Sequence, residues 1–208
     1  MMSKKEAEQR KKEGKLWLDS TRGFVEAQTV KFFAGRLNRT WPVNVPGRFL
    51  LEKLVFGSFG KSWLEPPVNV CVGRNTHIGN NCYINFNASF VDDYTITIED
   101  NVLFGPNVTI ITTGHPVHPE LRPNGEMYCA PVTVKKGAWL CSNVVVLPGV
   151  TIGENAVIGA GSVVTKDIPA NTIAMGVPCR VVRTINDNDK IYYYKDRHID
   201  FGKIGESV

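Results

Sequence analysis

The sequence lacks any apolar run near the roughly 18 residues that a membrane-spanning helix needs. Its N-terminus, MMSKKEAEQRKKEGK, is highly charged and is not followed by an apolar segment, which is unlike a secretory signal. These two absences argue against a membrane partner and against export. We therefore expect the protein in the cytoplasm.

Cysteine is scarce and its spacing shows no pairing. The chain has five cysteines, an odd number, and no C-x-x-C pair. This pattern argues against a disulfide framework and against a structural zinc site, and it suits a reducing compartment. The cysteines are Cys71, Cys82, Cys129, Cys141 and Cys179.

A strong charge of one sign is also missing. Lys and Arg number 24 against 20 Asp and Glu, a net charge of +4. No basic cluster interleaves with aromatic residues, so nucleic acid is not expected as a partner. The mild positive excess would suit a phosphate-bearing ligand. With 208 residues, 43% hydrophobic and 21% charged, the chain fits one globular domain with an appendage.

Residues 1–57 predict a helical segment with a solvated, charged start. WPVNVPGR, residues 41–48, holds two prolines and a glycine, and it should separate a first helix from a second one, FLLEKLVF, at residues 49–56. Apolar residues recur at helical spacing in the first helix. They are Phe24, Val25, Val30, Phe32, Phe33 and Leu37.

Residues 58–185 change to a repeat of six. Large apolar residues stand at Val72, Ile78, Ile84, Phe90, Ile98, Phe104, Ile110, Val134, Leu140, Val146, Ile152, Ile158 and Val164. Four residues after them come smaller ones, among them Thr76, Cys82, Ala88, Val102, Val108, Ala138, Val144, Val150, Ala156 and Ser162.

A period of six fits neither an α-helix nor a single strand. It fits short strands joined by tight turns, with one large apolar residue per unit pointing into a narrow core. Turns that need a positive φ select Gly and Asn, as in GNN at Gly79–Asn81 and GEN at Gly153–Asn155. Such units stack into a solenoid, here a parallel β-helix.

The stretch TTGHPVHPELRPNGEMY, residues 112–128, breaks the repeat. The register leaves after the hexad Ile110–His115 and resumes near Val132, which predicts a loop insertion at residues 116–131. About sixteen residues is long for a structureless connection, which favours a functional role. A C-terminal tail, residues 186–208, contains Tyr192–Tyr194 and is expected to pack on the solenoid or on a neighbouring chain.

These hexads resemble those of the hexapeptide-repeat acyltransferases, whose left-handed β-helix has three hexads per coil. Longer stretches are similar to the galactoside O-acetyltransferases, with the maltose and nodulation-factor acetyltransferases as close relatives. The resemblance covers about residues 63–195, nearly without gaps, and extends to GKLWLD at residues 14–19. It is carried by WLEPPVNVCVGRNTHIGNNCYINFN, VDDYTITIEDNVLFGPNVT, TGHPVHPELRPNGEMY and VLPGVTIGENAVIGAGSVVTKDIPANTIAMGVPCRVVRTI.

The resemblance implies a mainly β chain with an extruded loop. It also implies a homotrimer that moves an acetyl group from acetyl-CoA to a sugar hydroxyl, expected to be a 6-hydroxyl, with active sites between subunits. Acetyl transfer to an alcohol needs a base, donors for the thioester oxygen, and alignment of both substrates. An imidazole, with an ordinary pKa of about 6.5, suits the base.

His115 in TGHP falls on the family's catalytic histidine, whereas taken alone it reads as a surface residue that caps a turn. As base it would act by direct attack of the hydroxyl, without an acyl-enzyme and without a metal. Its second nitrogen needs an acceptor, and both Glu126 and the backbone carbonyls of the insertion are candidates. His118 lies in the loop and is not expected to act.

On the acceptor side, Asn85 in YINFN matches a residue that contacts the acceptor and steadies the intermediate, and so is a second catalytic candidate. Asp93 in VDDY and Asp19 in KLWLD match aspartates that bind the acceptor. Asn85 and Asp93 also suit ordinary turns. Cys71 stands where the family has a serine, and a thiol is a weak hydrogen-bond partner, so the identity of the sugar stays open.

On the coenzyme side, the resemblance assigns a backbone N–H at Ser142 to the thioester region and Trp139 to the pantetheine channel, although Trp139 also suits outer packing. Arg180 and Arg183 match positions near the adenosine phosphates, where cations make strong bonds, and otherwise read as solvated arginines. Further coenzyme-contact positions are Ala160, Thr165 and Lys166.

Three alternatives remain. The acceptor could be maltose, glucose, a chitooligosaccharide or an antibiotic. A zinc enzyme like the β-helical carbonic anhydrases would need three converging histidines, and only His77, His115 and His118 are candidates. A non-catalytic scaffold would bind no acetyl-CoA and would not need His115.

Overall fold

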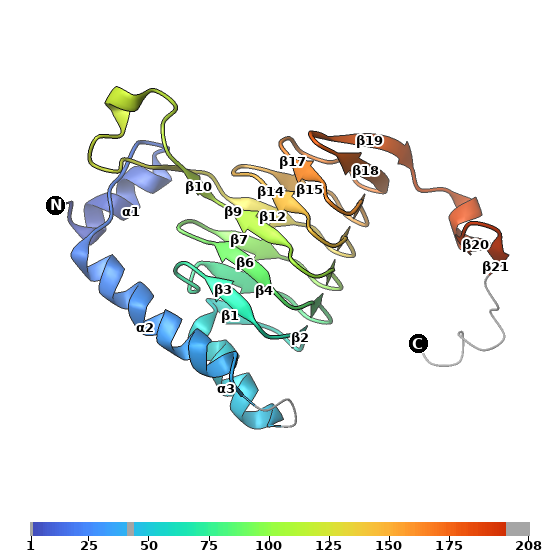
Figure 1. Cartoon of the computed structure of the whole chain (residues 1–208), viewed down its shortest axis with the longest axis horizontal. Helices are drawn as coiled ribbons and strands as arrows, with labels where there is room; N and C mark the ends of the chain where they lie inside the picture. The colour runs from blue at the N-terminus through green and yellow to red at the C-terminus, as the bar shows by residue number, and fades with distance from the viewer. Residues whose placement is uncertain (1, 41–43, 199–208) are drawn as a thin grey trace.

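The computed structural model describes residues 2–40 and 44–198. The chain is mainly β, and its body is a parallel β-helix, as the hexads predicted, with the left-handed winding that the resemblance implied. Three helices lie at one end of the solenoid, and a loop and a C-terminal arm project from it (Figure 1).

The helices are α1 (Lys4–Lys12), α2 (Thr21–Leu37) and α3 (Val45–Val55). Each begins at a polar N-cap, Ser3, Ser20 or Asn44, whose side chain accepts a hydrogen bond from a backbone N–H of the first turn. Because Asn44 is the cap, α3 starts at Val45, within the segment predicted to separate the helices. Residues 41–43 of that segment lie outside the described residues.

The buried face of α2 differs from the prediction. Phe24, Val25 and Phe32 are exposed, whereas Ala27, Val30, Ala34 and Leu37 are buried. Two of these four are alanines, whose small side chains allow the helix to lie close to the solenoid. Its C-cap holds it there, because the Asn38 side chain exchanges hydrogen bonds of 2.9 and 2.8 Å with the backbone of Val68.

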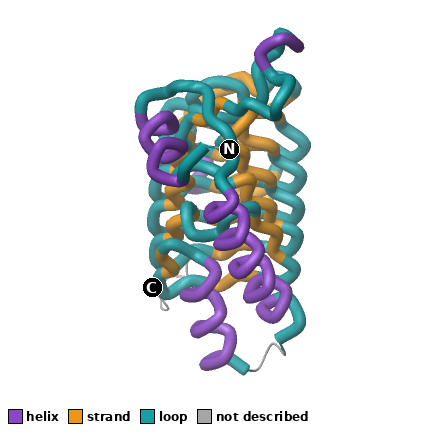
Figure 2. Tube along the Cα trace, turned by 90° about the vertical axis from the view of Figure 1, so that its left-hand side faces the viewer, coloured by secondary structure: helices purple, strands orange, loops and turns teal. Residues whose placement is uncertain are grey.

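The solenoid has three faces, and its strands are stacked along its length with loops at the edges (Figure 2). The first face contains β1 (Ser58–Phe59), β4 (Thr76–Ile78), β7 (Ile96–Ile98), β12 (Val132–Val134) and β15 (Thr151–Ile152). The second contains β2 (Trp63–Leu64), β5 (Tyr83–Ile84), β8 (Leu103–Phe104), β13 (Trp139–Leu140), β16 (Val157–Ile158), β18 (Thr172–Gly176) and β19 (Cys179–Thr184). The third contains β3 (Val68–Val70), β6 (Ala88–Val91), β9 (Thr109–Ile111), β14 (Val145–Val146) and β17 (Val163–Val164).

Neighbouring strands of each face are parallel and in register, except for the antiparallel pair of β18 and β19. The large apolar residues of successive coils therefore stack inside the solenoid. All of those predicted are buried except Val72, which is half-buried at a corner. The smaller residues predicted four positions later are buried as well.

The turns confirm a positive φ at asparagines and also at Gly73, Gly137, Gly149 and Gly161, with φ from 70° to 83°, but not at the two glycines quoted from the sequence. Asn81 and Asn155 both have a φ of 55°, in the left-handed region. The glycines that precede them do not. Gly153 is needed for space instead, because a Cβ there would lie 2.4 Å from the backbone nitrogen of Ala170.

The loop leaves the wall earlier than predicted. Thr113–Gly114 forms β10, which pairs antiparallel with β11 (Tyr128–Cys129) instead of with a wall strand. A 3-10 helix, η1 (Pro119–Leu121), lies within the loop. His115 directly follows β10, so it stands at the end of a two-stranded ribbon, β10 with β11, that has already left the wall. We call this pair the His115 ribbon. The sequence had placed His115 as the last residue of a wall hexad.

The C-terminal arm consists of η2 (Asp187–Lys190), β20 (Tyr192–Tyr194) and β21 (Arg197–His198). β20 and β21 form a hairpin beyond the end of the solenoid (Figure 1). Its three tyrosines are exposed, so they do not pack on the solenoid as one of the two predicted arrangements required. Residues 199–208 of the tail lie outside the described residues. Among the helices of the described chain, none has the length and apolar character to cross a membrane.

We expect Ile152→Ala to destabilise the fold by about 2–5 kcal/mol, because it opens a cavity in the stacked core. Val182→Ala, at an exposed position of β19, is the control and should change the free energy of unfolding by less than about 0.5 kcal/mol. Chemical denaturation measures both. Changes in the free energy of unfolding that were small and equal in the two variants would contradict a core built from the stacked residues.

Candidate active site

The predicted site residues lie mainly on two edges of the solenoid, one on either side of the third face. One edge, between the second and third faces, carries Asn85, Ser142 and Ala160. Ile84, Leu140 and Ile158 stand in one ladder, so the residues that follow them also stack. We call this the Ser142 edge.

The other edge, between the third and first faces, carries Cys71, Asp93, Thr165 and Lys166, and the His115 ribbon leaves from it. Its register follows from the ladder that joins β3, β6, β9, β14 and β17. We call this the His115 edge. The third face separates the two edges, and the four residues of β6 alone span about 10 Å at roughly 3.3 Å per residue. His115 and Asn85 therefore do not meet within one chain.

Three predicted acceptor residues share one cavity of about 540 Å³, at the His115 edge beneath α1 and α2. Asp19, Cys71 and Asp93 all line it, although they are far apart in the sequence. A second hollow of about 660 Å³ is lined by Leu18, Asp19, His115, Asn124, Gly125 and Met127. Asp19 lines both spaces, so the predicted base and the acceptor aspartates belong to one region.

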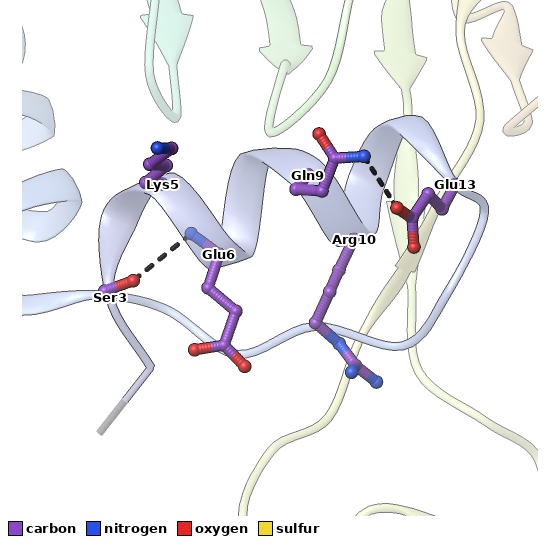
Figure 3. Close-up of a pocket in the computed structure, with 6 residues that line it drawn as sticks. All are labelled: Ser3, Lys5, Glu6, Gln9, Arg10 and Glu13. Atoms are coloured by element: carbon purple, nitrogen blue, oxygen red, sulfur yellow. Dashed lines mark hydrogen bonds between the residues drawn. The ribbon is translucent and has the colours of Figure 1, made fainter.

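A further hollow of about 550 Å³ lies along α1, away from these residues. Figure 3 shows its lining, in which Gln9 donates to Glu13 at 2.6 Å and the Ser3 side chain accepts from the Glu6 N–H at 3.2 Å. The bonds are those of an ordinary helix surface and its cap. No predicted site residue lines this hollow, so we leave it out of the site.

His115 is exposed, and its Nδ1 lies 2.8 Å from the backbone carbonyl oxygen of Glu126. A carbonyl can only accept, so Nδ1 carries the proton and Nε2 keeps its lone pair in the neutral ring. The Glu126 carboxylate does not hold the histidine, since it accepts bonds from the Asn124 backbone and side chain instead. His118 caps η1, where its Nδ1 accepts from the Glu120 N–H at 3.3 Å.

Asp93 is half-buried, and burial raises the pKa of its carboxyl, while Lys11 acts in the opposite direction. Its neighbour Asp92 has a structural role. The Asp92 carboxylate accepts from the Val72 N–H at 2.8 Å and from the Thr76 hydroxyl at 3.0 Å, and so closes the corner between two coils. In the sequence this corner is marked by Phe90 and Ile98, which stand eight residues apart instead of six.

Burial raises the pKa of the Cys71 thiol to about 11, and Asp93 adds to the shift. The thiol is therefore protonated at neutral pH. It offers the cavity a weak donor and a polarisable surface where a serine would offer a strong hydrogen-bonding hydroxyl. Cys71 lies in the wall of the cavity that Asp19 and Asp93 also line.

The Ser142 edge has an open backbone donor. Within the described residues the Ser142 N–H has no hydrogen-bond acceptor, although its carbonyl accepts from Gly161 at 2.9 Å. The backbone of the neighbouring coil approaches it closely. A Cβ at Gly105 would lie 2.6 Å from the Ser142 nitrogen, so only glycine fits there. Trp139 stands close by with its indole exposed on the outer second face, and Ala160, one coil further, is also exposed.

The two arginines lie on β19, at the C-terminal end of the solenoid. The Arg183 guanidinium donates two parallel bonds of 2.7 and 2.6 Å to the Asp189 carboxylate, and this contact lowers the pKa of Asp189 to about 2. Arg180 donates to the Cys179 carbonyl at 2.8 Å. Both are exposed, as are Thr165 and Lys166 on the His115 edge.

Sequence reasoning missed Lys11, Trp17 and Met127, all of which border the acceptor region. It also left the histidines without a metal role, and their surroundings differ from one another. His77 pairs with the Ser58 hydroxyl at 3.2 Å, and the rings of His198 and Tyr192 are in contact, tilted by 53° with their centroids 4.4 Å apart. Across residues 2–40 and 44–198, no group of three or more His, Cys, Asp or Glu side chains is placed to hold a metal ion.

Residues 131–166 match the family model for bacterial transferase hexapeptide (six repeats). The chain is 54% identical over 189 residues to galactoside O-acetyltransferase of Escherichia coli K12, covering 90% of this chain and 93% of that protein. A solved galactoside acetyltransferase in complex with coenzyme A superposes with a TM-score of 0.90 at 50% identity, covering 96% of this chain and all of the other. A maltose O-acetyltransferase from Clostridium difficile 630 gives 0.83 at 38% identity, with 86% and 97% covered.

We expect iodoacetamide to label Cys71 slowly at neutral pH. A pKa of about 11 instead of the usual 9 leaves about a hundredth of the ordinary thiolate, and the thiolate is the nucleophile. Peptide mass spectrometry, with Cys71→Ser as the control for assignment, measures the rate, which should rise about tenfold per pH unit and level off only above the raised pKa. Labelling as fast as in the unfolded chain would contradict a raised pKa at this half-buried thiol.

Proposed function

Because the chain belongs to the galactoside O-acetyltransferase family of hexapeptide-repeat acyltransferases, we propose that it moves the acetyl group of acetyl-CoA to a hydroxyl, preferably the 6-hydroxyl, of a galactoside or related sugar. One observation carries the proposal. The bond from His115 Nδ1 to the Glu126 carbonyl leaves Nε2 free to accept a proton, beside a space that Asp19 also lines.

In this mechanism the acceptor hydroxyls bind Asp19, Asp93 and the Cys71 thiol in the shared cavity. His115 Nε2 takes the proton of the attacking hydroxyl and later returns it to the departing sulfur. Acetyl-CoA supplies a thioester that is already activated, so no covalent enzyme intermediate is needed. The aligned binding of both substrates accounts for much of the remaining rate enhancement.

The Ser142 N–H and the Asn85 amide are the donors for the negative charge that develops on the thioester oxygen. The open Ser142 N–H supports this role. The glycines and Ala160 along the edge leave room for a long, thin ligand, with Trp139 as one wall. Thr165, Lys166, Arg180 and Arg183 would bind the far end of the coenzyme, where the arginines suit phosphates. No step needs a metal ion.

We further propose that the enzyme is a homotrimer with its sites between copies. The donors on the Ser142 edge and the base on the His115 edge lie on opposite sides of the third face, so a complete site needs the His115 edge of one copy and the Ser142 edge of the next. A ring of heterologous contacts satisfies this need for every copy at once.

The outer surface of the second face supports such a contact. On this face, the outward-facing residues of successive strands are apolar along the whole solenoid. On the first face, the corresponding residues are polar, namely Ser58, His77, Thr97, Thr133 and Thr151. The apolar ladder is Trp63, Tyr83, Leu103, Trp139, Val157 and Ile173. An exposed apolar strip of this length is typical of an interface with another protein.

The acceptor is the open part of the proposal. The likeness to a maltose O-acetyltransferase makes maltose and glucose the next candidates, and Cys71 changes one contact in the cavity. An acceptor screen with acetyl-CoA, following thiol release over galactosides, maltose, glucose and chitooligosaccharides, tests the function. Acetyl transfer to none of these sugars would contradict it.

The five unbridged thiols would suit a cytoplasmic enzyme.

We expect His115→Ala to lower kcat for the best acceptor by about 10²–10⁴-fold, the usual contribution of a general base. Steady-state kinetics with that acceptor measures the loss. His118→Ala, in the same loop, is the control and should keep near wild-type turnover, because His118 only caps η1. Near wild-type turnover in His115→Ala would contradict the mechanism.

A further inference from the structure

Lys11 is a buried cation that the mechanism above does not use. Its side chain is only 8% exposed, which is unusual for a lysine. The ammonium donates to the backbone carbonyl of Asp93 at 2.9 Å and to the Glu8 carboxylate at 3.3 Å. It also lies 3.8 Å from the centre of the Trp17 ring. These three contacts offset the loss of water around the charge.

Trp17, beneath this cation, is 2% exposed and is tied to the histidine loop. Its backbone N–H donates to the Met127 carbonyl and its carbonyl accepts from the Met127 N–H, both at 2.9 Å. The indole N–H is buried and has no hydrogen-bond acceptor within the described residues, so the backbone pairing with Met127 is what ties Trp17 to the loop. Lys11 thus rests on the residue that anchors the loop.

The residue before Met127 is Glu126, whose carbonyl fixes His115. One continuous set of contacts therefore runs from Asp93 through Lys11, Trp17 and Met127 to the catalytic histidine. It crosses from the solenoid to α1 and back to the loop, and it borders the cavity that Asp19 lines.

We propose that Lys11 is a positioning residue that sets Asp93 and the His115 loop at their working separation, and that it acts through Asp93 and Trp17. The proposal rests on the proposed function, since Asp93 and His115 are its acceptor ligand and its base. Loss of the ammonium leaves the Asp93 carbonyl without its buried donor and Trp17 without its cation. The pairing of Trp17 with Met127 then loosens, and with it the hold on the Glu126 carbonyl.

The test compares Lys11→Met with Lys12→Met, its exposed neighbour on the same helix. Methionine keeps the length and apolar stem of lysine and removes only the charge. We expect kcat/KM for the acceptor to fall at least about tenfold in Lys11→Met, because small misplacements of reacting groups have large effects on rate. KM for acetyl-CoA should not change, since the Ser142 edge lies across the third face, and Thr165 and Lys166 lie three coils further along the His115 edge. Lys11→Arg should restore part of the loss.

Hydrogen exchange gives a second readout that needs no substrate. The Met127 amide should exchange at least about tenfold faster in Lys11→Met than in Lys12→Met, while amides of the wall strands keep their protection. If the wild-type enzyme acetylates no sugar, the proposed function fails, but the exchange result still tests whether Lys11 holds the His115 loop in place.

Two results would overturn the inference. Equal acceptor kinetics and equal Met127 exchange in both variants would show that Lys11 positions nothing. A Lys11→Met enzyme with a lower Tm, and with the KM values for acceptor and acetyl-CoA changed alike, would assign Lys11 to overall stability alone.

Discussion

Each coil of the solenoid stacks on the one before it in register, so a residue lies directly beside its counterpart in the next coil. The ladder through Ile84, Phe104, Leu140 and Ile158 is one example. This constraint fixes the core, because one large apolar residue per unit points inward. It also fixes the site, because the polar residues that follow each strand are held at the edges, in rows. Asn85 and Ser142 share one edge for this reason, and the His115 ribbon leaves from another.

The same register made the body of the fold predictable from sequence. A period of six places residues such as Leu140 inside and Asn155 in a tight turn, and the structure agrees. Handedness could not come from the period, since either hand buries the same residues, and it followed from the resemblance. The buried face of α2 was mispredicted because Phe24 and Phe32 are more apolar than Ala27 and Ala34, whereas the close approach to the solenoid favours the small residues.

The meeting of three predicted acceptor residues was expected from the sequence, but the contacts that support them were not. Asp19, Cys71 and Asp93 were expected together and do line one cavity. The contacts that hold this region join distant segments, namely α1, the strand-like pairing at Trp17, and the loop near Met127. Neither propensity nor spacing encodes such contacts, because they depend on how the N-terminal segment folds back over the corner at Asp92. Lys11 lies in a run of charged residues, so the sequence predicted it to be solvated, whereas the structure buries it.

The central claim is that the two halves of the site come from different copies, and complementation tests it most directly. His115→Ala and Asn85→Ala proteins, each with little activity alone, would be mixed in equal amounts and reassembled. Sites between copies predict that about a quarter of them combine both intact residues, with activity recovered to match. No more activity than in the separate variants would contradict the account, since it would mean that His115 and Asn85 act from the same chain.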